Sequence, residues 1–261
     1  MAKVSVEGAP YPYIKFLGTA GARFVMIKQL RASGGIWLSY RDTNILIDPG
    51  PGSIVRCSLS RPKLDPSKLD AIILTHRHLD HSSDINVMIE AMTEGGFKKR
   101  GTVFCPRDAL GESGVILKYA LDFPQGIKTL RARSNYKVGD ISFETSMRHI
   151  HPVETYGLKF RIGDKSVALL TDTKYFPQLA GFYRADILII CVVFSQMRPE
   201  IEHLSLPEAV SLIRDIKPGK AVLTHFGMTM LNAKPHIQAE RLSKELGVEV
   251  AAAYDGMSIK L

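Results

Sequence analysis

The stretch AIILTHRHLDH (71–81) decides the fold that we expect, because it joins an apolar run to a dense group of metal-ligand side chains. Its first part is typical of a fully buried strand. Directly after it, three of the eight histidines of the chain fall within six residues, with Asp80 among them. His76 and His78 lie two residues apart, so in an extended segment their imidazoles leave the same face. Imidazole and carboxylate are common ligands of zinc and similar divalent ions, so the stretch predicts a metal site at a strand end.

More ligand-type residues come at the ends of later predicted strands. A lone histidine after a strand is usually structural, but several such residues beside the first motif favour a pair of metal ions. The residues are His151 after strand 141–147, Asp172 after strand 165–171 and His225 after strand 220–224. His149 also follows strand 141–147, and strand alternation sends residues 149 and 151 to the same face, so this pattern does not choose between them.

Short apolar or alternating runs bounded by turn residues predict a chain with many strands. Helices are expected later, interleaved with strands, and Gly163-Asp164 is expected to form a hairpin turn. Repeats and linker-like tracts do not occur, so residues 1–261 are expected to form a single domain. The predicted strands are 13–18, 35–40, 44–48, 71–75, 141–147, 156–162, 165–171, 186–194, 220–224, 248–254 and 256–261, and the predicted helices are 83–93, 206–216 and 235–246.

The composition excludes several classes of protein. With 45% hydrophobic and 23% charged residues, the 261-residue chain is not intrinsically disordered. The longest apolar run, residues 187–194, is far shorter than the roughly 20 residues that cross a bilayer, so no membrane association is expected. The N-terminal sequence MAKVSVEGAPYPY has no apolar core typical of a signal peptide. The three cysteines have no CxxC spacing, which indicates a reducing compartment and a cytoplasmic protein.

The charge distribution is uneven. The formal net charge is +8, and residues 98–137 hold nine Lys and Arg against three Asp and Glu. This stretch is either a solvated basic face or a surface for an anionic partner, including nucleic acid.

Taken together, these motifs resemble the metallo-β-lactamase superfamily of binuclear hydrolases, and in particular its ribonuclease Z and cyclic phosphodiesterase branch. In that branch a ligand histidine lies six residues before a glycine of the next strand, which here favours His151 (before Gly157) over His149. His203-Leu204-Ser205 resembles the branch's His-Ser/Thr element. The other matching stretches are Phe16-Leu17-Gly18-Thr19, Asp48-Pro49-Gly50, His76 to His81, Asp172, His225 and Ala253-Tyr254-Asp255-Gly256-Met257.

The resemblance implies an α/β fold, an αββα four-layer sandwich of two mixed β-sheets flanked by helices. It also implies two divalent metal ions, zinc first, with manganese or iron as alternatives. One ion would be bound by His76, His78 and His151, the other by Asp80, His81 and His225, with Asp172 bridging both. Asp48 would orient a ligand histidine as a carboxylate behind it.

The function implied is a metal-dependent hydrolase in which a metal-bridging hydroxide attacks the substrate. Asp80 would hold the proton of this hydroxide, and His203 would protonate the leaving oxygen or bind a phosphate oxygen. The favoured substrate is a nucleotide, cyclic phosphate or RNA, that is, a small anionic phosphodiester or a nucleic acid. A lactonase or a glyoxalase II-like thioester hydrolase is the alternative, and a non-enzymatic binding protein is the third.

Two departures argue against tRNA processing. Ile190-Cys191 stands where ribonuclease Z carries a His-Glu pair, and no Gly/Pro-rich insertion provides a tRNA-clamping arm. Homodimers are usual in the branch, so the resemblance is compatible with a homodimer.

Overall fold

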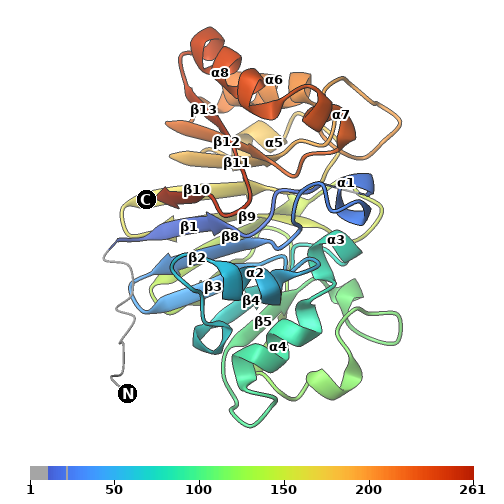
Figure 1. Ribbon diagram of the computed structural model, residues 1–261, viewed down its shortest axis with the longest axis vertical. Helices are drawn as coiled ribbons and strands as arrows, with labels where there is room; N and C mark the ends of the chain where they lie inside the picture. The colour runs from blue at the N-terminus through green and yellow to red at the C-terminus, as the bar shows by residue number, and fades with distance from the viewer. Residues whose placement is uncertain (1–10, 22) are drawn as a thin grey trace.

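Two β-sheets of seven strands each form the body of the molecule (Figure 1). The computed structural model describes residues 11–21 and 23–261. Most of the N-terminal sequence MAKVSVEGAPYPY, for which no signal peptide is expected, lies outside the described residues. Sheet A has the order β14-β1-β2-β3-β4-β5-β6, and sheet B has the order β13-β12-β11-β10-β9-β8-β7. Sheet A contains β1 (Tyr13–Phe16), β2 (Ile36–Tyr40), β3 (Thr43–Ile47), β4 (Ala71–Ile73), β5 (Thr102–Cys105), β6 (Gly126–Thr129) and β14 (Ser258–Lys260). Sheet B contains β7 (Asn135–Val138), β8 (Ile141–Arg148), β9 (Tyr156–Ile162), β10 (Lys165–Leu170), β11 (Ile187–Cys191), β12 (Lys220–Thr224) and β13 (Glu249–Ala252).

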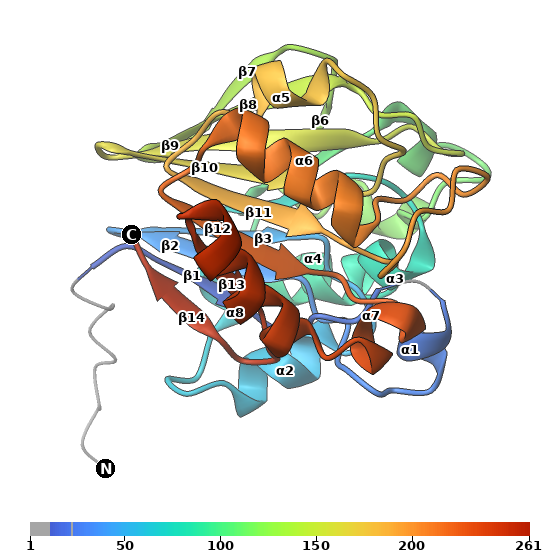
Figure 2. The same ribbon diagram turned by 90° about the horizontal axis from the view of Figure 1, so that it is seen from above.

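Helices cover the outer face of each sheet, which confirms the expected four layers (Figure 2). The two sheets pack against each other through a core that includes Phe16, Phe104, Phe143 and Phe160. Sheet A is covered by α2 (Ser53–Leu59) and α4 (Ile85–Thr93), and sheet B by α5 (Leu179–Phe182), α6 (Leu206–Ile216) and α8 (Pro235–Leu246). The remaining helices are α1 (Phe24–Ile27), α3 (Leu79–Ser82) and α7 (Met228–Asn232).

The strand directions bring the candidate residues to one edge of the sandwich. β3 and β4 are parallel neighbours in sheet A, and β10, β11 and β12 are parallel neighbours in sheet B. Because the carboxyl ends of parallel strands meet at the same edge of a sheet, the loops that follow these strands lie together. The expected hairpin is confirmed, since Ile162 pairs with Lys165 across Gly163-Asp164.

The structure adds elements that the sequence pattern did not predict. β5, β6 and β7 lie within or beside the basic stretch, and α2 follows β3 directly. Helix α4 confirms the predicted helix 83–93, and α2 packs on sheet A in a part of the chain where no helix was predicted. Among residues 11–21 and 23–261, no helix combines the length and apolar character needed to span a membrane.

Candidate metal centre

The seven predicted ligands lie together at the shared edge of the two sheets. Among the described residues, four overlapping groups of side chains there have all their ligand atoms within 4.8 Å of one another, and two of these groups contain the seven residues. The first group is His76, His78 and His151, and the second is Asp80, His81, Asp172 and His225. The family resemblance implies the same division, and each group draws residues from segments that follow strands of both sheets. The other two groups join Asp48 to His76 and His81, and His203 to His151 and Asp172.

Asp172 lies between the two groups. Its Oδ2 is 3.6 Å from Nε2 of His76 in the first group and 3.4 Å from Nε2 of His81 in the second. Its Oδ1 is 3.4 Å from Nε2 of His225. The side chain is 1% exposed, so its two oxygens face only this cluster. A carboxylate in this position can contact an ion in either group, as a bridging ligand would.

The residues present fit divalent metal ions because their ligand atoms are otherwise unsatisfied. Buried polar atoms in proteins are almost always hydrogen-bonded. Here a set of buried side-chain atoms that all point into the cluster has no hydrogen-bond partner in the described structure. The atoms are Nε2 of His76, His81 and His225, Oδ2 of Asp80, and both carboxylate oxygens of Asp172. Imidazole nitrogens and carboxylate oxygens without partners are the donor set that zinc and similar ions bind.

Asp48 fixes the orientation of His81. Its Oδ1 accepts a 2.7 Å hydrogen bond from the backbone N–H of Thr75, and its Oδ2 accepts one from the Thr75 hydroxyl at 2.7 Å. Oδ2 also lies 3.0 Å from Nδ1 of His81, which therefore donates its proton there and leaves Nε2 for an ion. In the Asp48-Pro49-Gly50 turn, a Cβ on Gly50 would lie 2.1 Å from the carbonyl oxygen of Asp80, so glycine is needed for this approach.

His149 and His151 have different surroundings. His151 Nε2 lies 3.0 Å from Nδ1 of His78, inside the first group, and its Nδ1 donates to the carbonyl of Glu202 at 3.0 Å. Both ring nitrogens of His149 are already occupied, one by the Asp172 carbonyl at 2.9 Å and one by the Tyr183 hydroxyl at 2.5 Å. His149 is therefore a structural residue behind the cluster.

The spacing to Gly157 has a physical reason. A Cβ on Gly157 would lie 1.8 Å from the Tyr183 hydroxyl oxygen, which is the group that hydrogen-bonds His149. Glycine at this position therefore leaves room for the Tyr183 ring behind the cluster. Neither Tyr183 nor the Glu202 carbonyl carried a signal in the sequence, because both act through contacts between distant segments.

His203 lies beside the cluster and is held by the start of α6. Ser205 is the N-cap of that helix and forms a reciprocal capping box with Glu208. The intervening Leu204 is buried, so the backbone on both sides of it is fixed. Nδ1 of His203 lies 3.6 Å from Oδ2 of Asp172, and the His203 side chain is 14% exposed.

Burial and neighbouring charges shift the pKa values of the titratable groups of the cluster in different directions. Burial lowers the pKa of His151 to about 4, and it also holds the pKa of His76 well below the usual range. Burial opposes the charged form of His81 as well, but the carboxylates of Asp80 and Asp48 raise its pKa well above the ordinary value. Burial alone would raise the pKa of Asp172, yet the adjacent His225 and His203 keep it well below the usual value. Asp172 is therefore a carboxylate, the form that binds metal.

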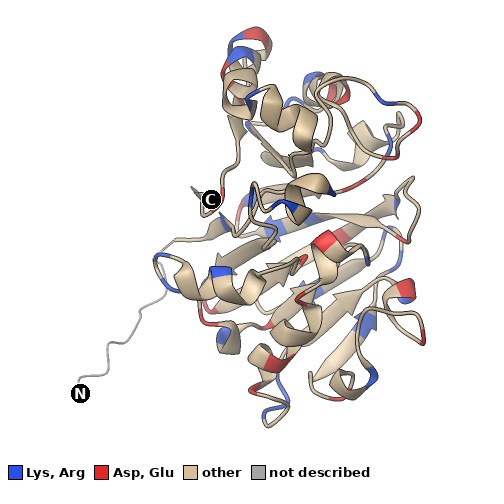
Figure 3. Ribbon diagram, turned by 45° about the vertical axis from the view of Figure 1, so that its right-hand side comes forward, with Lys and Arg blue, Asp and Glu red and all other residues tan. Residues whose placement is uncertain are grey.

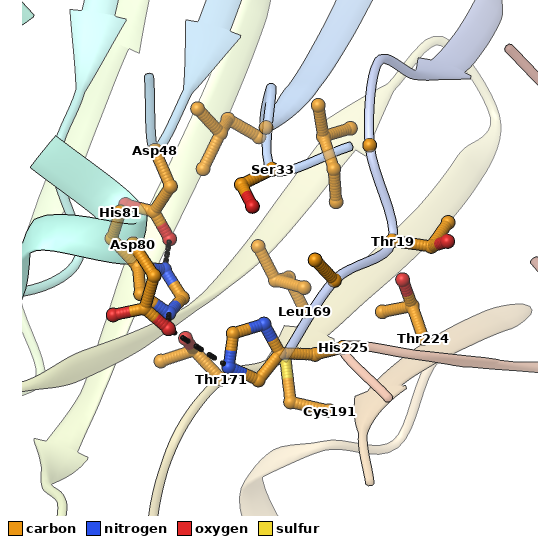
Figure 4. Close-up of a pocket in the computed structure, with 15 residues that line it drawn as sticks. Thr19, Ser33, Asp48, Asp80, His81, Leu169, Thr171, Cys191, Thr224 and His225 are labelled. Carbon is orange, nitrogen blue, oxygen red and sulfur yellow. Dashed lines mark hydrogen bonds and ion pairs between the residues drawn. The ribbon is translucent and has the colours of Figure 1, made fainter. Parts of the chain in front are cut away.

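A cavity opens beside the second group (Figure 4). Asp48, Asp80 and His81 line one side of it, and His225 and Cys191 lie on the other side. Burial raises the pKa of the Cys191 thiol well above its ordinary value, so it lines the cavity as a neutral group. Cys191 is not among the residues grouped as metal ligands in the described part of the chain.

Known proteins with similar sequences belong to a family of metal-dependent hydrolases. Residues 43–226 match the family described as the beta-lactamase superfamily domain. The chain belongs to the metallo-β-lactamase superfamily. An uncharacterized protein of Methanocaldococcus jannaschii is 30% identical over 95% of this chain and 94% of its own length. Ribonuclease Z of Thermoplasma volcanium is 26% identical over 87% of this chain and 91% of its own length.

Solved structures of this metallo-β-lactamase superfamily share the fold. The metallo-beta-lactamase fold protein YhfI from Bacillus subtilis superposes with a TM-score of 0.79 at 21% identity, covering 96% of this chain and all of that one. The superfamily and these relatives identify the chain as a metal-dependent hydrolase.

Proposed function

We propose that the protein is a phosphodiesterase that uses two divalent metal ions, zinc first, bound by the seven residues of the cluster. The observation that carries this proposal is the position of His203. Its imidazole lies next to Asp172 but is 14% exposed, whereas the side chains of Asp172 and His76 are at most 1% exposed. His203 can therefore meet a substrate at the mouth of the site, where the ligands His78 and Asp80 are half-buried as well.

Two bound ions would supply Lewis acidity, which lowers the pKa of a water molecule and neutralises charge on a phosphoryl oxygen. The residues of the chain perform the remaining steps. The Asp80 carboxylate would accept a proton from the attacking water. His203, whose pKa Asp172 raises against the effect of burial, donates a proton to the leaving oxygen or a hydrogen bond to a phosphate oxygen.

The basic stretch supports an anionic substrate. Of its nine Lys and Arg residues, only Lys98 and Arg100 form ion pairs with carboxylates of the described residues. The other seven remain available to phosphate groups, although basic and acidic positions are otherwise interspersed along the ribbon (Figure 3). A nucleotide, a cyclic phosphate or RNA fits this charge, and the ribonuclease Z relative supports a nucleic acid in this class.

The test is a comparison of substrates on the metal-loaded enzyme. We expect turnover of phosphodiesters, and activity only on a lactone or a thioester would favour the alternative hydrolase. His203→Ala should keep both metal ions and lower kcat on a poor-leaving-group phosphodiester by roughly 10²-fold or more. The loss should be smaller with p-nitrophenolate as leaving group, because this oxygen hardly needs a proton. His236→Ala, an exposed histidine on α8, is the matched control and should retain full activity.

Equal losses of kcat for good and poor leaving groups would assign His203 to phosphate binding instead. No loss in His203→Ala on any phosphodiester would contradict both roles.

A further inference from the structure

A second cationic hollow lies on the outer face of sheet A, away from the metal ligands. Ile14 and Phe16 of β1 point into the core between the sheets, so Lys15 between them points to the opposite face, on the side of α2. There it lines a hollow of about 280 Å³ together with Arg56, Arg61 and Asp255. We call this hollow the Lys15 pocket.

Lys15 is buried and forms no ion pair with a carboxylate of the described residues. The residue is 5% exposed. Its Nζ donates to two neutral oxygens, the Arg61 carbonyl at 3.1 Å and the Ser258 hydroxyl at 3.2 Å. An ammonium has three N–H donors, so one is left over in the pocket. Because burying an unpaired charge is unfavourable, a buried ammonium without an anion is a site where an anionic ligand would be stabilised.

The two arginines of the pocket are also bound only to neutral groups. Arg56 donates from Nε to the carbonyl of Leu17 at 3.0 Å, and Arg61 donates from Nη1 to the carbonyls of Leu59 and Ser60. Within the described residues, neither arginine forms an ion pair. Each guanidinium has five N–H donors, so both keep several for a ligand.

Asp255, the one carboxylate of the pocket, is already used elsewhere. Its Oδ1 accepts from the Thr19 hydroxyl and its Oδ2 accepts from the backbone N–H of Ala32, both at 2.8 Å. Lys15, Arg56 and Arg61 bring three positive charges against this single negative charge, so the pocket has an excess of two. The charge and the free donors therefore suit a dianion.

We propose that the Lys15 pocket binds a phosphate dianion, either inorganic phosphate or the terminal phosphate of a small monoester such as a nucleoside monophosphate. Guanidinium groups bind phosphate oxygens in pairs of parallel hydrogen bonds, and lysine adds a point charge. The volume lies near the lower limit of about 300–1,000 Å³ for small-molecule pockets, which suits a phosphate group rather than a large ligand. None of the seven residues of the metal cluster lines this pocket, so the site is separate from the proposed catalytic centre.

The test is calorimetric titration of the metal-loaded protein with inorganic phosphate and, separately, with adenosine monophosphate. Lys15→Met should weaken binding by at least about 10-fold, since it removes a charged hydrogen bond. Lys244→Met, which removes an exposed lysine from helix α8, is the matched control and should bind as the wild type does. The ligand that binds with the higher affinity shows whether the pocket takes inorganic phosphate or a phosphate monoester.

Methionine is an apolar substitute for the buried lysine stem, so Lys15→Met should fold. Arg56→Gln, at a partly buried position on α2, tests the same pocket without changing the strand and should also weaken binding by at least about 10-fold. Undiminished binding in both variants would overturn the proposal, as would no measurable binding to the wild type at millimolar phosphate. Binding that is lost in Asp172→Ala but kept in Lys15→Met would place the phosphate at the metal centre and also overturn it.

Discussion

Replacing Asp48 by asparagine should selectively weaken one of the two metal sites. Asp48 accepts three hydrogen bonds, two from Thr75 and one from Nδ1 of His81. Asparagine has nearly the same shape, and it tolerates the left-handed backbone at this position, where φ is 51°. However, one of its two terminal atoms is an NH₂ group, which is a donor.

Either orientation of the asparagine amide creates a conflict. If the NH₂ group takes the place of Oδ1, it faces the backbone N–H of Thr75, which can only donate. If it takes the place of Oδ2, it faces Nδ1 of His81, which must then lose its proton to Nε2, the nitrogen that faces the ion. Loss of such an orienting partner usually costs about 10–100-fold in metal affinity, which corresponds to about 1.4–2.7 kcal/mol.

The assay is a competitive titration of the metal-free protein with zinc and a chromogenic chelator, fitted to two sites. We expect the affinity of one site to fall and the other to stay within about 3-fold of the wild type. Asp70→Asn is the matched control, because Asp70 also accepts a backbone N–H between strands, from Asn44, but lies outside the cluster. Two unchanged sites in Asp48→Asn, or equal weakening of both, would refute this account of how His81 is oriented.

Three further changes test other parts of the site. Asp172→Ala should lose at least one of two tightly bound ions and most activity, and a variant with two tight ions and normal turnover would contradict the bridging assignment. His151→Ala should lose metal while His149→Ala keeps it, as metal analysis after gel filtration would show. The reverse result would mean that His149, not His151, is the ligand. Burial lowers the pKa of His149 to about 4, so below pH 6.5 only the unfolded chain gains this proton, and stability is lost as the pH falls. Urea denaturation of the metal-free proteins at pH 7 and pH 4 should therefore show that the unfolding free energy of the wild type falls by up to about 3 kcal/mol more than that of His149→Gln. Equal falls in the two proteins would contradict the low pKa of His149.

Much of the candidate site could be predicted from the sequence because its residues follow strands directly. His76, Asp172 and His225 each come immediately after an apolar run, and such runs identify buried strands. The residues that support them could not be predicted in the same way. Tyr183 and the Glu202 carbonyl reach the cluster from segments 34 and 51 residues away in the chain, and a backbone carbonyl has no sequence signature.

Two strands and one helix that were not predicted lack an apolar pattern. Strands β6 and β7 are the edge strands of their sheets, and their residues are mostly exposed or half-buried. Edge strands commonly carry charged residues, which hides their alternation in the sequence. Helix α2 buries only Ser53 and Cys57, so it has no apolar stripe from which a helix could be predicted.

The origin of the ligands in two different sheets has a consequence for the stability of the whole protein. His76 and His78 follow strand β4 of sheet A, whereas His151 follows strand β8 of sheet B. Ions bound as proposed would cross-link the two halves of the sandwich at one edge, in a chain whose three cysteines are all free. Because an ion that binds only the folded chain stabilises it by mass action, the melting temperature of this protein would rise with the concentration of free metal.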